Sequence, residues 1–205
     1  MRRAALVALA LTLAACNRSD PPPRAVATED AAPSPSPVAT DGVAGPTTAS
    51  EVALALDAEG LRFVANDTGS TSLLAFGAPR GEVEQAIQRA TGGTPRRSTG
   101  EECPAGPTEF TSFGELQLAF QDDRWIGWAL GGAFPATTMD GIGIGTPRAR
   151  VERTRELTMV SDSTLGDEFV LGSADQETAI GGIFGGPGPK DRIAYLWAGV
   201  ACNFR

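Results

Sequence analysis

Two short stretches, Phe76-Gly-Ala-Pro-Arg-Gly-Glu-Val-Glu84 and Ile144-Gly-Thr-Pro-Arg-Ala-Arg-Val-Glu152, decide how the folded part of this chain is organised. They are identical at five of nine positions and lie 68 residues apart. The match predicts an internal duplication with units at about 73–131 and 141–199, the alternative being two independent helix starts. Further matches at the same offset are Asp123-Arg124 with Asp191-Arg192, and Gly131 with Gly199.

Each stretch predicts a turn followed by a helix. Glycine permits a tight turn out of a strand, and Pro79 and Pro147 suit the first turn of a helix, where a missing N–H costs nothing. The first helix should end at Thr91-Gly92-Gly93. The second, from Pro147 to about Leu157, is more charged and should be more solvated. The apolar stripe of the first helix consists of Val83, Ala86, Ile87 and Ala90.

Alternating apolar residues predict strands after each helix and a hairpin before the first one. The predicted fold class is α+β, with tandem helix-then-β-hairpin repeats that form one antiparallel sheet. Both helices should lie on one face of this sheet, which leaves the other face available for a partner. The predicted strands are 52–56 and 61–65 in the leading hairpin, 116–120 and 125–130 in the first unit, and 168–171, 179–184 and 193–200 in the second.

The Gly-x-x-Arg-x-x-Val helix start, the Gly93-Thr94-Pro95 turn after the helix and the hairpin that follows resemble the repeat of SmpA/OmlA-type envelope lipoproteins and of β-lactamase-inhibitor-like proteins. The resemblance covers about 73–131 and, less well, 141–199. It implies a non-enzymatic envelope module that binds another protein through its sheet face. No functional residue of these families is specific enough to carry over.

The first residues predict a bacterial lipoprotein signal peptide at 1–15. Arg2 and Arg3 are followed by the apolar run 4–13, which is too short for a permanent membrane span of about 20 residues. Leu13-Ala14-Ala15-Cys16 resembles a lipobox, which implies that the Cys16 thiol carries a diacylglycerol and that the mature N-terminus is acylated, as with palmitate. The alternatives are an ordinary signal with an incidental cysteine and a twin-arginine signal.

The acylated cysteine places the chain in the cell envelope as a membrane-anchored protein facing the periplasm or the exterior. In a host with two membranes, Asn17 after the cysteine implies the outer one by analogy with known lipoproteins. Residues 16–50 read as a disordered tether, because 17–50 holds seven prolines and no aromatic residue, Leu, Ile or Met. Residues 51–205 form the single folded domain.

Composition excludes several function classes. The chain has no histidine, which rules out Ser-His-Asp and Cys-His catalysis and His-ligated metals. Its formal charge of −8 argues against nucleic acid, and no cofactor or metal site is predicted. Asp122-Asp123 with Asp191, or Asp140 with Glu152, would be the candidate carboxylate pairs for glycoside hydrolysis. Turn formation explains such aspartates better.

The cysteines other than Cys16 are Cys103 and Cys202. In an oxidising compartment such a pair most often forms a disulfide, the alternative being a free redox thiol.

Tryptophans supply the candidate binding surface. With strict period-two alternation, Trp128 and Trp125 point to opposite faces of their strand, so both cannot lie in the core of a sheet covered on one side. One of the two is therefore a candidate hot spot for a partner. The alternative is that the tail, a hairpin or the disulfide loop covers it.

Together these features predict a lipid-anchored, non-enzymatic binding or scaffolding module for an envelope protein or polymer. The alternatives are a carboxylate-based enzyme on cell-wall substrates and a small-ligand carrier or sensor.

Overall fold

The computed structural model describes residues 51–172, 178–185 and 192–202. The predictions for the signal peptide, Cys16 and the tether lie outside these residues. No helix among those described is long and apolar enough to span a membrane. The elements are β1 (Val52–Asp57), β2 (Gly60–Ala65), β3 (Thr71–Ala75), α1 (Arg80–Thr91), β4 (Arg96–Gly100), β5 (Thr108–Phe113), β6 (Leu116–Gln121), β7 (Arg124–Gly131), β8 (Thr137–Thr138), α2 (Arg148–Thr154), β9 (Leu157–Met159), β10 (Asp167–Leu171), β11 (Ile180–Gly185) and β12 (Arg192–Gly199).

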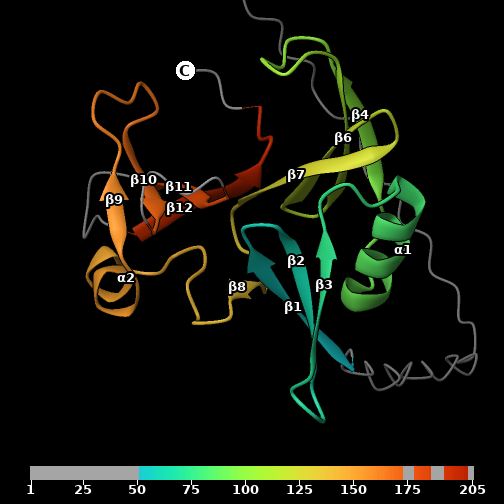
Figure 1. The fold of residues 1–205 in the computed structure, drawn as a ribbon, viewed down its shortest axis with the longest axis horizontal. Coiled ribbons are helices and arrows are strands. Elements are labelled where there is room, and N and C mark those ends of the chain that lie inside the picture. The colour runs from blue at the N-terminus through green and yellow to red at the C-terminus, as the bar shows by residue number, and fades with distance from the viewer. Residues whose placement is uncertain (1–50, 173–177, 186–191, 203–205) are drawn as a thin grey trace, which may run out of the picture. The chain divides into compact units, whose positions relative to one another are not determined.

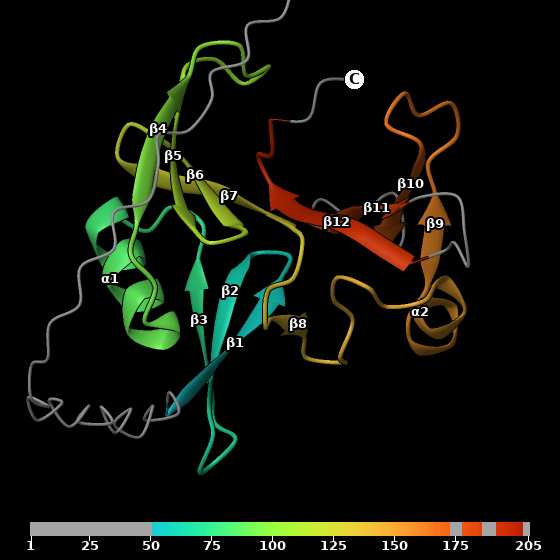
Figure 2. The same cartoon turned by 180° about the vertical axis from the view of Figure 1, so that it is seen from behind.

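The larger of two sheets has eight strands in the order β4-β5-β6-β7-β12-β11-β10-β9 (Figures 1 and 2). Every neighbouring pair in it is antiparallel. Each helix is followed in the chain by four strands of this sheet, α1 by β4 to β7 and α2 by β9 to β12. The last strands of the two series, β7 and β12, pair with each other at the centre.

The smaller sheet has the order β3-β2-β1-β8, with β8 parallel to β1. The α+β class is confirmed, but the prediction of one sheet is wrong. The leading hairpin, β1 and β2, forms where it was expected, and β3 and β8 complete a second sheet around it. Its apolar residues Leu54, Leu56 and Leu61 belong to the same core as the large sheet, so the hairpin covers that sheet instead of extending it.

Helix α1 begins and ends where the sequence predicts. Pro79 precedes it in extended conformation, and Gly92 ends it in the left-handed region at φ 67°, donating its N–H to the Gln88 carbonyl. Val83 and Ile87 are fully buried. Helix α2 stops after seven residues, short of the predicted end near 157, because Arg155 is extended and Leu157 already pairs in β9.

A turn before α1 fixes the helix to the last strand of its own series. Gly77, at φ 89°, donates its N–H to the Trp125 carbonyl over 2.7 Å. The Arg124 guanidinium in turn donates to the Gly77 carbonyl over 3.2 Å, and Pro79 lies in a β-bridge with Arg124. The residues of the Gly-x-Pro stretch thus bond to the start of β7.

The turn before α2 makes the corresponding contacts with β12. Gly145, at φ 81°, donates to the Ile193 carbonyl over 2.7 Å. Arg192 donates to the Gly145 carbonyl over 2.7 Å, and Pro147 forms a β-bridge with Arg192. Each of these contacts lies 68 residues after its equivalent in the first turn.

A β-bulge in β7 sets the direction of both its tryptophans. Trp125 is opposite Phe120 and Trp128 is opposite Leu118 on β6. Ile126 therefore has no opposite residue on β6 and is the extra residue of the bulge. Because Leu118 and Phe120 are two positions apart, their side chains share a face, and the two tryptophans therefore share it too. Both indoles are fully buried in the core.

Strand β12 carries the same irregularity. Ile193 is opposite Phe184 and Tyr195 is opposite Ile183, which leaves Ala194 as the extra residue, 68 positions after Ile126. In consequence the side chains of Ile193 and Leu196 join the core, as those of Trp125 and Trp128 do in β7.

One core lies on a single face of the large sheet, beneath the helices and the small sheet. Val83 of α1 and Val151 of α2 both reach it. The Trp128 indole connects the two sheets, since its Nε1 donates to the Asp57 carbonyl of β1 over 3.0 Å. The large-sheet residues of this core include Phe113, Leu116, Leu118, Phe120, Leu130, Phe169, Leu171, Ile180 and Leu196.

We predict that Trp128→Phe lowers the free energy of unfolding by about 2 to 4 kcal/mol, because it removes the bond to Asp57 and leaves unfilled volume between the sheets. Chemical denaturation monitored by circular dichroism measures the change. Tyr195→Phe is the matched control, since Tyr195 is partly exposed and lies outside the core cluster, and it should cost about 1 kcal/mol or less. Equal losses in the two variants would contradict the assignment.

Candidate functional site

The tryptophans predicted as a binding surface are not at the surface. Trp125 donates its Nε1 to the Gly127 carbonyl over 2.8 Å and meets the Phe76 ring at 4.9 Å between centroids. Trp128 is equally buried. The prediction failed because it assumed strict alternation along 124–131, which the bulge at Ile126 interrupts. Of the covers considered, the leading hairpin contacts Trp128 through the Asp57 carbonyl, while Phe76 packs on Trp125.

The other face of the large sheet, which we call the outer face, is the candidate site. Its side chains alternate with those of the core along each strand, and none of them belongs to the core cluster. No described helix has its buried residues on this side. The outer face includes Phe110, Ser112, Gln117, Ala119, Ala129, Thr158, Val170, Ile183, Tyr195 and Trp197, with Arg96 and Ser98 of β4 and Glu168 of β10 toward its borders.

Two aromatic residues occupy its centre. Tyr195 and Trp197 are neighbours on β12, with ring centroids 5.8 Å apart; Trp197 is buried, at 8% exposed, whereas Tyr195 is accessible in part. Tyr195 is opposite Gly131 on β7, and Trp197 is opposite Gly181 on β11. Their rings lie over these glycines, because a Cβ on Gly181 would be 2.5 Å from the indole and one on Gly131 would be 3.0 Å from the phenol ring. The glycines therefore provide the space in which the rings lie against the sheet.

Tyr195 combines an apolar ring with a hydroxyl at this centre. The side chain is partly exposed, and burial raises its pKa above the ordinary value of 10.0. It therefore stays neutral at physiological pH and can donate one hydrogen bond. Around it lie Ile183 and Val170, also partly exposed, and the amide of Gln117. This mixture of aromatic, aliphatic and uncharged polar groups is typical of protein-binding surfaces.

A disulfide borders the first half of the outer face. Cys103 and Cys202 lie at disulfide distance, with 2.07 Å between sulfurs and 5.0 Å between Cα atoms, in agreement with the predicted pair. The bridge attaches the segment after β12 to the loop between β4 and β5. A hollow of about 420 Å³ adjoins it, lined by 100–103, Phe110 and Cys202.

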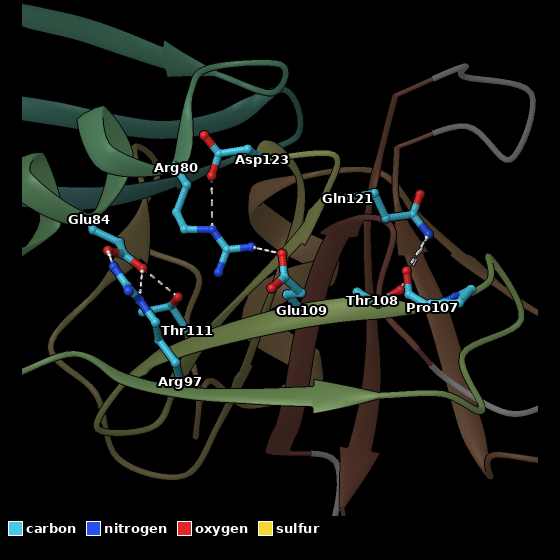
Figure 3. Close-up of polar contacts among 9 residues, drawn as sticks. All are labelled: Arg80, Glu84, Arg97, Pro107, Thr108, Glu109, Thr111, Gln121 and Asp123. Atoms are coloured by element: carbon cyan, nitrogen blue, oxygen red, sulfur yellow. Dashed lines mark hydrogen bonds and ion pairs between the residues drawn. The ribbon is translucent and has the colours of Figure 1, made fainter.

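The loop behind that hollow is anchored by a single amide. Gln121 on β6 donates to the Ala105 carbonyl over 2.8 Å. It also donates to the Pro107 carbonyl over 3.3 Å (Figure 3). This fixes the loop that carries Cys103 against the sheet.

A carboxylate lies at the opposite border. Glu168 follows Ile183 in the row of paired residues that begins at Tyr195. It is 1% exposed, and Ser163 of the β9–β10 loop donates to it over 2.6 Å. The Ser163 hydroxyl also accepts the N–H of Leu165 over 3.0 Å, so the loop is folded against this edge of the outer face.

Charged side chains gather on the helix side of the sheet instead. Arg80, at the start of α1, has a side chain 10% exposed and pairs with Glu109 and, over 3.2 Å, with Asp123 (Figure 3). Its guanidinium lies 4.6 Å from the Phe120 ring centre. The group therefore joins the first turn of α1 to β5 and to the β6–β7 turn.

Glu84, one turn further along α1, is held by β4 and β5. Arg97 donates to it through Nε over 3.0 Å and also through Nη2, and Thr111 donates over 2.7 Å. Burial acts to raise the pKa of Glu84, but the hydrogen bonds from Arg97 and Thr111, with the charges of Arg97 and Arg80, outweigh it. The pKa of this carboxyl thus lies below its ordinary value of 4.5.

The carboxylates considered for catalysis are placed as turn and ion-pair residues. Asp122 and Asp123 both have positive φ, at 48° and 59°, in the two-residue turn between β6 and β7. Asp140 is bound by Thr138 and Arg155, and Glu152 is bound by Arg148 over 2.8 Å. Asp191 lies outside the described residues, within which no three Cys, Asp or Glu side chains are grouped to hold a metal ion.

An apolar groove of about 450 Å³ lies away from the outer face. It is bounded by β1, the end of α1, the β5–β6 turn and Phe134-Pro135, and none of its lining residues is charged. It is lined by Val52, Ala53, Leu54, Asn66, Ala90, Thr91, Gly93, Phe113, Gly114, Phe134 and Pro135.

Comparison with known proteins identifies no relative. No protein-family model matches the chain, and neither curated proteins nor solved structures give a match.

Sequence reasoning missed the aromatic pair at the centre of the outer face. A signal was present, because Tyr195 and Trp197 alternate with Leu196 and Ala198 in the predicted strand 193–200. The glycines opposite them, Gly131 and Gly181, could not be matched without the strand register.

The Glu84 pKa predicts acid sensitivity. Because the folded-state pKa is below the unfolded one, the stability it contributes is full above the unfolded value and is lost as pH falls through the folded value. Glu84→Gln should cost about 2 kcal/mol at neutral pH and should flatten the fall in unfolding free energy below pH 4.5. Urea titrations at several pH values measure both effects. In Glu82→Gln, at an exposed position of the same helix, the acid slope should match wild type.

Removing the disulfide should destabilise the fold. Cys103→Ala with Cys202→Ala is expected to cost about 2 to 4 kcal/mol, because the bridge closes a loop with a sequence separation of 99 residues. The melting temperature should fall in this variant, and a reductant should lower it in wild type alone. Identical melting curves with and without reductant would contradict the bridge.

Proposed function

We propose that this chain is a lipid-anchored envelope protein whose folded domain binds another envelope protein through the outer face, without catalysing a reaction. The observation that carries the proposal is the partly exposed Tyr195 ring, which lies over Gly131 beside the buried indole of Trp197. Aromatic residues held rigidly on a sheet bind partners at low entropic cost, because few rotatable bonds are immobilised.

The division between the two faces supports a binding role. On the helix side, the buried charges of Arg80 and Glu84 form ion pairs and hydrogen bonds that fix α1 to the sheet. The outer face carries uncharged groups at its centre, on β7, β12 and β11, while Arg96 and the buried Glu168 lie at its borders. A partner can therefore contact it without desolvating a buried ion pair, which is costly.

We also propose that 73–131 and 141–199 are tandem copies of one unit. The sequence match at an offset of 68 supports this, as do the equivalent contacts of Gly77 and Gly145 and the extra residues Ile126 and Ala194. Duplication would explain why the outer face extends across both halves of one sheet.

Anchoring follows from the sequence. The lipobox predicts acylation at Cys16, and the tether 16–50 would reach at most about 100 Å at 3.1 Å per residue. With a formal charge of −10 after removal of 1–15, the domain should be repelled by anionic headgroups. The outer face would then be free to meet a partner above the membrane.

A photo-crosslinking amino acid placed at single positions of the full chain, in its own envelope, tests the proposal. Positions Ile183 and Gln117 on the outer face should give one covalent product of defined mass. The exposed positions Gln85 of α1 and Arg153 of α2 should not. Adding Tyr195→Ala should reduce the Gln117 product about tenfold or more, which corresponds to roughly 1.4 kcal/mol, with the melting temperature measured in parallel. Crosslinking that is equal at all four positions would overturn the proposal.

A small-ligand carrier is the second candidate, favoured by the uncharged groove between β1 and the end of α1. Ligand binding by a carrier would depend on the residues of the groove and not on those of the outer face. A carrier would keep its ligand in the Tyr195→Ala variant and lose it when Ala90→Phe fills the groove.

A further inference from the structure

We propose that strand β3 is a self-association site, at which a second copy of this chain adds its own β3 antiparallel to the first. β3 (Thr71–Ala75) is an edge strand of the small sheet, paired with β2 on one side. In both views it lies at the side of this sheet remote from β8 (Figures 1 and 2). This interface lies away from the outer face and is independent of the proposed function.

The direction of the backbone groups identifies what the free edge offers. Ala65 donates to the Ser70 carbonyl, and Phe76 donates to the Glu59 carbonyl, so residues 70 and 76 bond toward β2. In an antiparallel ladder this direction alternates along the strand, so residues 72 and 74 also bond toward β2. The residues that face the free edge are therefore Thr71, Leu73 and Ala75, of which the Ala75 carbonyl already accepts the N–H of Ala78 over 3.3 Å.

The other edge strands of the described sheets are protected against such pairing. β8 has two residues and β9 has three, which is too short for a useful ladder. β4 follows Pro95 and begins with Arg96-Arg97. Short length, proline and charge are the ordinary means by which proteins block edge pairing. β3 has none of them, since 68–76 contains no charged residue and no proline.

Exposed apolar surface coincides with this edge. Leu73 is 36% exposed and, with Met139, is one of two large apolar residues exposed among those described. It lies opposite Arg62 on β2, on the side of the strand away from Leu74, which packs against the core. Pairing would cover Leu73, whereas Leu74 is already partly buried.

The edge is complementary to itself. If Leu73 lies opposite Leu73 of the second copy, Thr71 faces Ala75 in both directions and no charge opposes a like charge. This matters because the chain has a formal charge of −8, so two copies repel except where they meet through a neutral segment. The second copy is therefore the occupant that β3 fits. One five-residue pair falls short of the roughly 1,200 Å² of a stable interface, so the dimer should be weak and dependent on concentration.

The first test is a matched pair of lysine variants in the full chain, solubilised in mild detergent and followed by sedimentation velocity over a wide concentration range. Wild type should shift from monomer to dimer. Leu73→Lys should weaken dimerisation about tenfold or more, because two like charges would meet at the symmetry axis. Met139→Lys replaces the other exposed apolar residue and should dimerise as wild type does. A monomer at all concentrations, or equal weakening in both variants, would overturn the proposal.

Cysteine crosslinking in intact membranes tests the register. In the proposed pairing the two Leu73 Cα atoms are about 5.5 Å apart, within the range of a disulfide. Leu73→Cys should therefore form a dimer of twice the chain mass under mild oxidation. Ser72→Cys should not, because its side chain points to the opposite face and lies across from Leu74. Equal crosslinking of the two variants would overturn the register. A Leu73→Cys product with a mass other than twice the chain would show that a foreign strand takes the edge, which overturns self-association.

Discussion

The central ladder between β7 and β12 is the constraint on which the rest of the structure depends. Each of these strands is the last of its own series of four, and its first residues bond to the Gly-x-Pro turn that precedes the series. Each strand also contains one bulge residue just after those bonds. The turns at Gly77 and Gly145 thus fix both helices relative to the centre of the sheet. The extra residues, Ile126 and Ala194, redirect the side chains that follow, so that the same face is apolar in both halves.

Because the bulges redirect these side chains, one face of the large sheet packs the core and the other does not. Trp125 and Trp128 fill the space under α1 and the small sheet, which requires both indoles on one side of β7. Once the core is satisfied in this way, the alternate positions carry no packing requirement from the helices. Tyr195 and Trp197 occupy such positions. Gly181 leaves space for the Trp197 indole, because the side chain of any larger residue there would occupy that space. Packing of the core therefore leaves the residues of the outer face free to vary.

The sequence alone was sufficient for α1, the leading hairpin and the longer strands, but it did not predict the early end of α2 or strands β3, β4, β5, β8 and β9. Pro79, Gly92 and the apolar stripe of α1 act within one helix, and the leading hairpin depends on neighbours a few residues apart, so both could be predicted. A β-bulge depends on the register with the opposite strand, and the residues next to Ile126 in the sequence give no signal of it. The disulfide was reached by counting cysteines, while the row of residues across the outer face needed a register that spans the whole domain.

The small sheet was predicted only in part for a related reason. A short strand such as β3 has uncharged, mixed residues, Thr71-Ser-Leu-Leu-Ala75, and only its pairing with β2 makes it a strand. The same pairing leaves its far edge without protection, whereas β4 carries arginines at its own edge. The other edge strands of the described sheets are short or charged, so the neutral edge of β3 calls for a separate explanation. Chain solubility cannot be that explanation, because Leu73 exposes apolar surface on an otherwise acidic protein. An edge that accepts another strand is the arrangement for which both the neutrality and the exposed leucine have a physical use.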